Sequence, residues 1–105
     1  MPRIAYNVTA TFSDQAGRER YLAWLTPGHV GQVLAGGASS AQVIAIDHDD
    51  AGGGLKVEAR YVFVSREALE RYFTVHAPAL RADGLKHFGP ETGVIFARSV
   101  GEIVD

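Results

Sequence analysis

The chain has 105 residues, of which 47% are apolar and 21% are charged, and its formal net charge is −2. This length predicts a single domain over residues 1–105, and this charge gives no basic surface suited to nucleic acid. The apolar runs are far shorter than the ~20 residues that span a bilayer, so no membrane segment is expected. With no cysteine and no secretory leader at the N-terminus, the sequence predicts a cytoplasmic protein.

The first segment alternates apolar and polar side chains over residues 4–12, the pattern of a half-buried strand. Ser13 and Asp14 then supply N-cap oxygens for a helix whose apolar residues recur at helical spacing. Thr26 and Pro27 predict a bend and a fresh start, with Thr26 as the N-cap and Pro27 in the first helical position. A Gly-Gly pair ends this second, short helix.

Two further strands are predicted over residues 40–48 and 55–64, and the second alternates clearly. The connection DDAGGG between them is rich in turn formers, so the two strands should form a hairpin. His48 stands beside several aspartates at this turn. They lack the remaining ligands of a calcium loop, and a solvated turn is expected.

A second long helix begins after Ser65, which is its predicted N-cap, and should stop at Asp83-Gly84. A connector, LKHFGPETG, follows and leads to a last strand over about residues 93–100. The order is therefore strand, helix, strand, strand, helix, strand. That order is typical of an α+β, ferredoxin-like βαββαβ fold, in which both helices cover one face of a four-stranded antiparallel sheet.

The opposite face of this sheet should carry polar side chains from the first and third strands. These are Asn7, Thr9, Thr11, Glu58 and Arg60. An antiparallel sheet can expose one face to water, so the pattern by itself does not require a dimer.

Four segments resemble a family of small bacterial domain-of-unknown-function proteins in the dimeric α/β-barrel superfamily. They are IAYNVTATF, the pair Trp24 and His29 in a W-x4-H spacing, ALERYFTVHAPALRADGLKHFG, and FARS. The resemblance implies a homodimer in which the bare sheet faces of two copies pack together as an α/β barrel. It carries no assigned reaction, because relatives in this superfamily include monooxygenases, isomerase-like enzymes and stress-induced proteins.

The second long helix raises one question of chemistry. His76 falls in the middle of its apolar arc and should point toward the sheet, while Arg81 should face the other way. An imidazole in a pocket there can serve as a general base near neutral pH. The alternative is a structural histidine that satisfies the carbonyl of Thr74, which Pro78 disturbs.

The candidate function is a cofactor-independent monooxygenase- or isomerase-like enzyme for a small organic molecule, with His76 as the catalytic residue. A non-catalytic protein that binds a small molecule or responds to stress is the alternative. The candidate ligand-binding residues are aromatic, and an ordinary core needs the same residue types. They are Tyr6, Trp24, His29, Tyr61 and Tyr72.

No metal site is expected, because the sequence has neither an HExxH motif nor a His pair at ligand spacing. No cofactor is expected either. Haem-degrading monooxygenases of this superfamily resemble a pattern of an Asn on the first strand, a Trp near the end of the third strand and a haem-ligating His late in the second helix. Asn7 fits the first position. Phe63-Val64 stands in place of the Trp, and His76 comes nearly two helical turns before the expected ligand.

Overall fold

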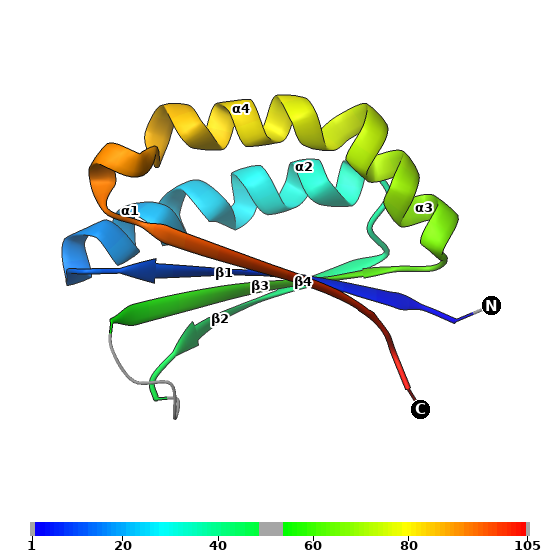
Figure 1. Ribbon diagram of the computed structural model, residues 1–105, viewed down its shortest axis with the longest axis horizontal. Helices are drawn as coiled ribbons and strands as arrows, with labels where there is room; N and C mark the ends of the chain where they lie inside the picture. Colours follow the sequence, from blue (N-terminus) through cyan, green and yellow to red (C-terminus); the bar gives the residue numbers. More distant parts are fainter. Residues whose placement is uncertain (1, 49–53, 105) are drawn as a thin grey trace.

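One antiparallel sheet forms a layer beneath all the helices (Figure 1). The computed structural model describes residues 2–48 and 54–104. The sheet has four strands in the order β2-β3-β1-β4. Their bounds are Ile4–Phe12 for β1, Ser40–Ile46 for β2, Leu55–Phe63 for β3 and Ile95–Glu102 for β4.

The helices occupy the two crossovers of this sheet. Between β1 and β2 lie α1 (Gln15–Trp24) and α2 (Val30–Ala35), and between β3 and β4 lie α3 (Arg66–Arg71) and α4 (Ala77–His87). This arrangement confirms the predicted ferredoxin-like α+β fold. Among the described residues, no helix has the length and apolarity needed to cross a membrane.

Four of the predicted strand ends differ slightly from the observed ones. Strands β2, β3 and β4 end at Ile46, Phe63 and Glu102. Strand β4 begins at Ile95, after a 3₁₀ turn over Pro90–Thr92. Gly93 follows that turn with a φ of 80°, a left-handed conformation that suits glycine. Residues 49–53 of the predicted DDAGGG connection, including the aspartates after His48, lie outside the described residues.

The core lies between the sheet and the helices. In β1 and β3, apolar and polar side chains alternate, and the antiparallel register places apolar residues opposite one another. It pairs Tyr6 with Tyr61 and Ala10 with Val57. Both pairs are buried. The prediction of one covered sheet face is therefore confirmed.

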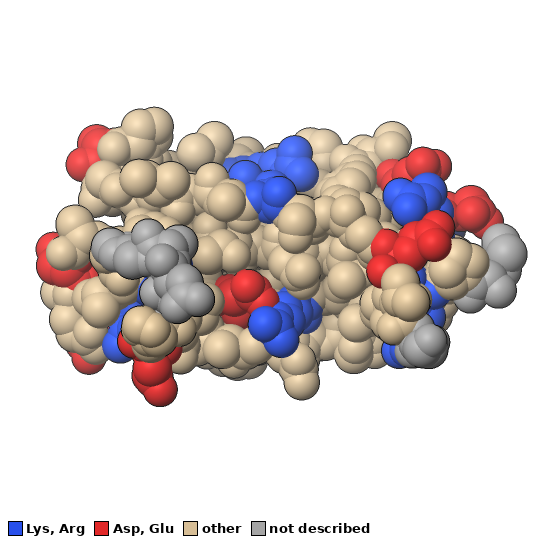
Figure 2. Space-filling model, turned by 60° about the horizontal axis from the view of Figure 1, so that its bottom comes forward, with Lys and Arg blue, Asp and Glu red and all other residues tan. Residues whose placement is uncertain are grey.

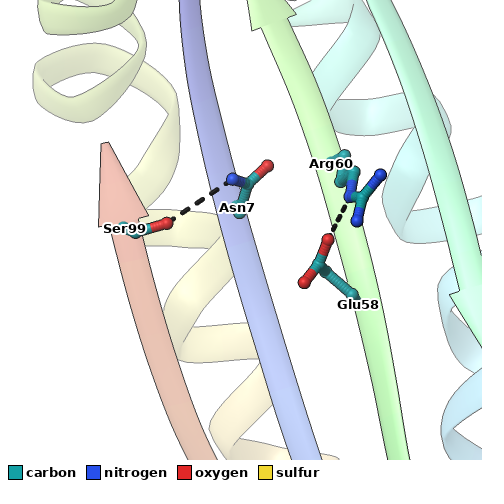
Figure 3. Close-up of polar contacts among 4 residues, drawn as sticks. All are labelled: Asn7, Glu58, Arg60 and Ser99. Atoms are coloured by element: carbon teal, nitrogen blue, oxygen red, sulfur yellow. Dashed lines mark hydrogen bonds and ion pairs between the residues drawn. The ribbon is translucent and has the colours of Figure 1, made fainter. Parts of the chain in front are cut away.

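The other sheet face carries the polar residues that the alternation assigned to it. Figure 2, in which this side comes forward, shows mostly uncharged surface with acidic and basic groups adjoining near its centre. Arg60 pairs with Glu58 on β3, and the Asn7 side-chain amide donates to the Ser99 hydroxyl at 3.5 Å (Figure 3). The first contact stays within β3, and the second joins β1 to β4.

The first crossover bends at Thr26, as predicted, but its capping differs from the expectation. Thr26 has φ −121° and ψ 123°, an extended conformation that interrupts the helix. Its hydroxyl donates 2.9 Å back to the carbonyl of Leu22, so Thr26 completes the end of α1 and does not cap the next helix. Regular helix resumes at Val30.

The second crossover begins as predicted, because the Ser65 hydroxyl accepts from the backbone N–H of Ala68 at 3.1 Å. The predicted stop at Asp83-Gly84 is wrong. Helix α4 runs through Gly84 to His87, and the N–H of Phe88 still bonds the carbonyl of Gly84 at 2.8 Å. The glycine lies against another helix here, since a Cβ at Gly84 would be 3.6 Å from the indole of Trp24.

Candidate functional site

A cavity of about 270 Å³ lies between the helices and the sheet. Its floor is the helix-facing side of the sheet, formed by Tyr6, Val8, Ala59, Tyr61, Phe96 and Arg98. One wall comes from α1 and the bend after it, and consists of Tyr21, Trp24 and His29. The other wall comes from α4 and the turn before it, and consists of Tyr72, Leu80, Arg81, Gly84, Leu85 and Phe88.

Every residue that the sequence proposed for ligand binding lines this cavity. Tyr6, Trp24, His29, Tyr61 and Tyr72 come from four separate segments of the chain, and the fold brings them together. Their rings are packed on one another: Tyr6 and Tyr61 stack with centroids 6.0 Å apart, and Tyr6 and Tyr72 lie 6.2 Å apart. The lining is therefore largely aromatic.

The tyrosines keep their phenol protons. Burial raises the pKa of Tyr21 and of Tyr72 to about 12, and burial also raises the pKa of Tyr61. The phenols of Tyr21, Tyr72 and Tyr6 raise the pKa of Tyr61 further. They present neutral hydrogen-bond donors to whatever enters the cavity.

His29 is the imidazole in this cavity. Its ring stacks on the indole of Trp24, with centroids 4.4 Å apart and an angle of 21° between the planes. Burial lowers its pKa from 6.5, and Asp83 opposes that shift. Among the described residues, the Nδ1 atom of His29 is one of two buried side-chain polar atoms without a hydrogen-bond partner; the other is Nε of Arg18.

His76, the predicted catalytic residue, does not line this cavity. The helix forms a wide turn over Tyr72–His76, in which the N–H of Ala77 bonds the carbonyl of Tyr72. Pro78 accounts for this turn, since it lacks an N–H and its ring crowds the preceding turn. The extra residue places Ala77, only 1% exposed, on the inner side in place of the histidine.

His76 instead packs beside the end of α2. A Cβ at Gly36 would lie 3.1 Å from Cγ of His76. The imidazole borders a separate, shallower hollow together with Glu67 and Arg71. Its catalytic role stays a prediction, but it is separated from the aromatic cavity.

Two functional candidates were missed from the sequence. Arg81 was expected on the outer side of its helix, but the wide turn before α4 rotates the rest of the helix and brings Arg81 to the cavity. Arg98 could have been found, because its strand register pairs it with Val8, on the helix-facing side. Its spacing of two residues from Phe96 carries the same information.

The described residues hold no group of three or more histidine, aspartate or glutamate side chains placed to bind a metal ion. The chemistry available at the cavity is therefore that of its imidazole, its phenols and its two guanidinium groups.

Several solved structures share this fold at low sequence identity. A dimeric ferredoxin-like protein from an uncultured marine organism is 17% identical, with a TM-score of 0.72 over 100% of this chain and 98% of that one. An ethyl tert-butyl ether degradation family protein from Bacillus halodurans is 14% identical, with a TM-score of 0.67 over 95% and 99%. SnoaB, a cofactor-independent oxygenase from Streptomyces nogalater, is 10% identical, with a TM-score of 0.66 over 100% and 96%.

No curated protein matches the chain. The sequence pattern that defines one family, described as Domain of unknown function (DUF4286), matches residues 3–103. This match spans nearly the whole chain and agrees with the resemblance seen in its segments. The protein belongs to the DUF4286 family of domains of unknown function.

Proposed function

We propose that this protein binds a small, planar organic molecule in the aromatic cavity and transforms it without a bound cofactor, as an oxygenase or isomerase does. The cavity itself carries the proposal. Ligand sites are mostly apolar and aromatic with a few placed polar groups, and those that take drug-sized molecules measure about 300–1,000 Å³. At about 270 Å³, this cavity suits a molecule of one or two rings.

The chemistry that we propose begins with proton removal by His29. Its lowered pKa keeps the imidazole neutral at neutral pH, and a neutral imidazole has one ring nitrogen that can accept a proton. The proton would come from a CH₂ group activated by an aromatic ring or a carbonyl. In an oxygenation, the carbanion then reduces O₂, one oxygen atom becomes a carbonyl on that carbon, and the other leaves as water. In an isomerisation, the proton returns to a different carbon.

The fold is compatible with such chemistry, since SnoaB has the same fold and is a cofactor-independent oxygenase. At 10% identity this likeness concerns the fold and does not transfer an activity. The identity of the base therefore needs a direct test. His29 and His76 are natural rivals, because each borders a different hollow.

Substrate-dependent oxygen uptake tests the proposal. Purified protein would be mixed in air with activated aromatic substrates of one or two rings, and uptake would be followed at an oxygen electrode. We expect His29→Gln to lower the rate by about 100-fold, the lower range for general-base catalysis, and His76→Gln to leave it near that of the wild type. Loss of the rate in His76→Gln alone would contradict the assignment to the aromatic cavity. Saturable binding with no turnover of any substrate would favour the non-catalytic binding protein.

We also propose that the protein is a homodimer formed through its bare sheet face. Apolar side chains from the outer strands, Ile44, Ile46 and Ile95, share that face with the Glu58–Arg60 pair. Ile95 is 67% exposed, an unusual exposure for a large apolar strand residue. The marine protein of the same fold is described as dimeric.

Light scattering at low micromolar concentration tests this assembly. The dimer should have twice the 11.3 kDa mass of the chain, and Arg60→Leu should shift it toward the monomer if the Glu58–Arg60 pair is buried between the copies. Leu34→Lys, on an exposed apolar residue of α2, is the matched control and should leave the mass unchanged. A wild-type species of 11.3 kDa would rule out the dimer at that concentration.

A further inference from the structure

Two guanidinium groups stand at the edge of the aromatic cavity on opposite layers of the fold. Arg81 comes from α4 and Arg98 from β4, and both residues are exposed while also lining the cavity. We infer that the cavity selects small aromatic carboxylates, with the ring among the aromatic side chains and the carboxylate held by Arg81 and Arg98. This inference rests on the proposed binding function and names its ligand class.

The placement of each arginine follows from the backbone. Arg98 lies opposite Val8 in the β1–β4 register, and Val8 packs on the core, so Arg98 is on the helix-facing side of the sheet. Its Cζ lies 5.6 Å from the ring centroid of Phe96. Arg81 lies equally far, 5.6 Å, from the ring centroid of Phe73. Each guanidinium thus rests on an aromatic ring, a contact that limits the directions it can take.

Both guanidinium groups act on the same buried phenol. Arg81 and Arg98 each lower the pKa of Tyr72 against the larger effect of burial, and Arg98 does the same to Tyr21. The two positive charges are therefore close to one wall of the cavity. Since burial still raises both phenol pKa values to about 12, the tyrosines stay neutral and do not cancel the charges.

Neither arginine is paired with a carboxylate in the described part of the chain. None of the described residues that line the cavity is Asp or Glu, and neither Arg81 nor Arg98 makes an ion pair with a described residue. Arg60 and Arg66, by contrast, pair with Glu58 and Glu102.

The local charge of the cavity is therefore positive in a chain whose net charge is −2. A guanidinium presents donors in a planar fork that matches a carboxylate, and an aromatic body would occupy the apolar space behind it.

The single tryptophan of the chain, Trp24, lines the cavity and reports on binding. 2-Naphthoate absorbs where indole emits, so its binding should quench the fluorescence of Trp24. 2-Naphthamide has the same rings and a similar shape without the charge. We expect the carboxylate to bind about tenfold more tightly than the amide, as suits hydrogen bonds to charged groups, and to weaken as salt is added.

Variants of Arg81 and Arg98 test whether these two residues cause the preference for the carboxylate. Arg81→Met and Arg98→Met keep an unbranched apolar stem but remove the charge, and each should abolish most of the tenfold preference. Arg98→Lys keeps the charge and should retain part of the preference. Arg20→Met, on the exposed side of α1 and away from the cavity lining, is the matched control and should bind both compounds like the wild type. Melting temperatures would verify that each variant is folded.

Equal binding of 2-naphthoate and 2-naphthamide to the wild type would overturn the selection of carboxylates and leave the proposed cavity standing. An unchanged preference in both methionine variants would overturn the assignment to these arginines. Failure of both compounds to quench Trp24 would overturn the proposed binding site together with this inference.

Discussion

The imidazole of His29 stacks on the indole of Trp24 at a centroid distance of 4.4 Å, although a bend in the helix separates the two residues in the chain. The extended conformation of Thr26 produces that bend. A straight α-helix would place residues five positions apart on different faces, at about 100° per residue. The bend therefore assembles this pair, and the pair forms one wall of the cavity.

The stability of the protein should depend on pH through His29. Burial places its folded-state pKa below 6.5, so the unfolded chain takes up the proton first as the pH falls. The stabilisation is complete above the unfolded pKa and is lost as the pH falls toward the folded pKa. Chemical denaturation from about pH 8 down to about pH 5 should show a steeper loss of stability for the wild type than for His29→Gln. Equal slopes for the two proteins would show that His29 is not desolvated.

Asp83 should tune the pKa of His29. Its carboxylate raises that pKa against the larger lowering by burial, so Asp83→Asn should lower the pKa of His29 further. An NMR titration of the His29 ring protons measures this directly. Asp47→Asn, just after β2 and not among the charges that shift the pKa of His29, is the control and should leave the value unchanged. A pKa that rises in Asp83→Asn would contradict the electrostatic account.

Replacing Gly84 should stabilise the fold and impair binding. Gly84 is inside α4, where alanine is favoured over glycine by about 0.5–1 kcal/mol. The new methyl group would lie 3.6 Å from the indole of Trp24, an ordinary contact that occupies space at the cavity lining. Gly84→Ala should therefore unfold at higher denaturant concentration and bind 2-naphthoate more weakly.

Gly31→Ala is the control for that variant, because its Cβ meets nothing within 4 Å. It should gain stability from the same helical preference and bind 2-naphthoate like the wild type. Undiminished binding by Gly84→Ala would mean that the ligand does not use this part of the cavity.

Replacing Gly36 should have the opposite effect on stability. A Cβ there would lie 3.0 Å from Cδ1 of Tyr72 and 3.1 Å from Cγ of His76, so Gly36→Ala should destabilise the protein by about 1–3 kcal/mol. In a His76→Ala background the same change should cost less, because the contact with Cγ is removed, although those with Tyr72 Cδ1 and with the Cβ of residue 76 remain. Denaturation of the four proteins of this cycle measures the coupling, and additive effects would show that His76 does not pack on Gly36.

Much of the fold was predictable because its signals are local. The alternation of β1 and β3, the N-caps Asp14 and Ser65 and the bend near Pro27 each depend on a few neighbouring residues. The predicted helix end at Gly84 was wrong because this glycine lies inside the helix, where it packs against Trp24, a residue far away in the sequence. Local sequence cannot distinguish a glycine that ends a helix from one that admits a ring from another helix.

The candidate site was predictable only in part. The candidate ligand-binding residues do line one cavity, because most of them lie on the inner faces of regular elements, and their role in binding stays a prediction. His76 and Arg81 were assigned to the wrong sides, because the wide turn over Tyr72–His76 adds one residue to the helical repeat. Pro78 indicated a disturbance of the helix there. Both a kink and a wide turn can accommodate the proline ring and its missing N–H, but they rotate the following residues by different amounts.

A crystal structure of the protein with 2-naphthoate is the most direct test of the claim that the aromatic cavity is a small-molecule site. We predict density for the naphthalene rings in the cavity beside Trp24 and Tyr61, with the carboxylate between Arg81 and Arg98. A cavity that contains only water at saturating 2-naphthoate, or that is closed by rearranged side chains, would contradict the account.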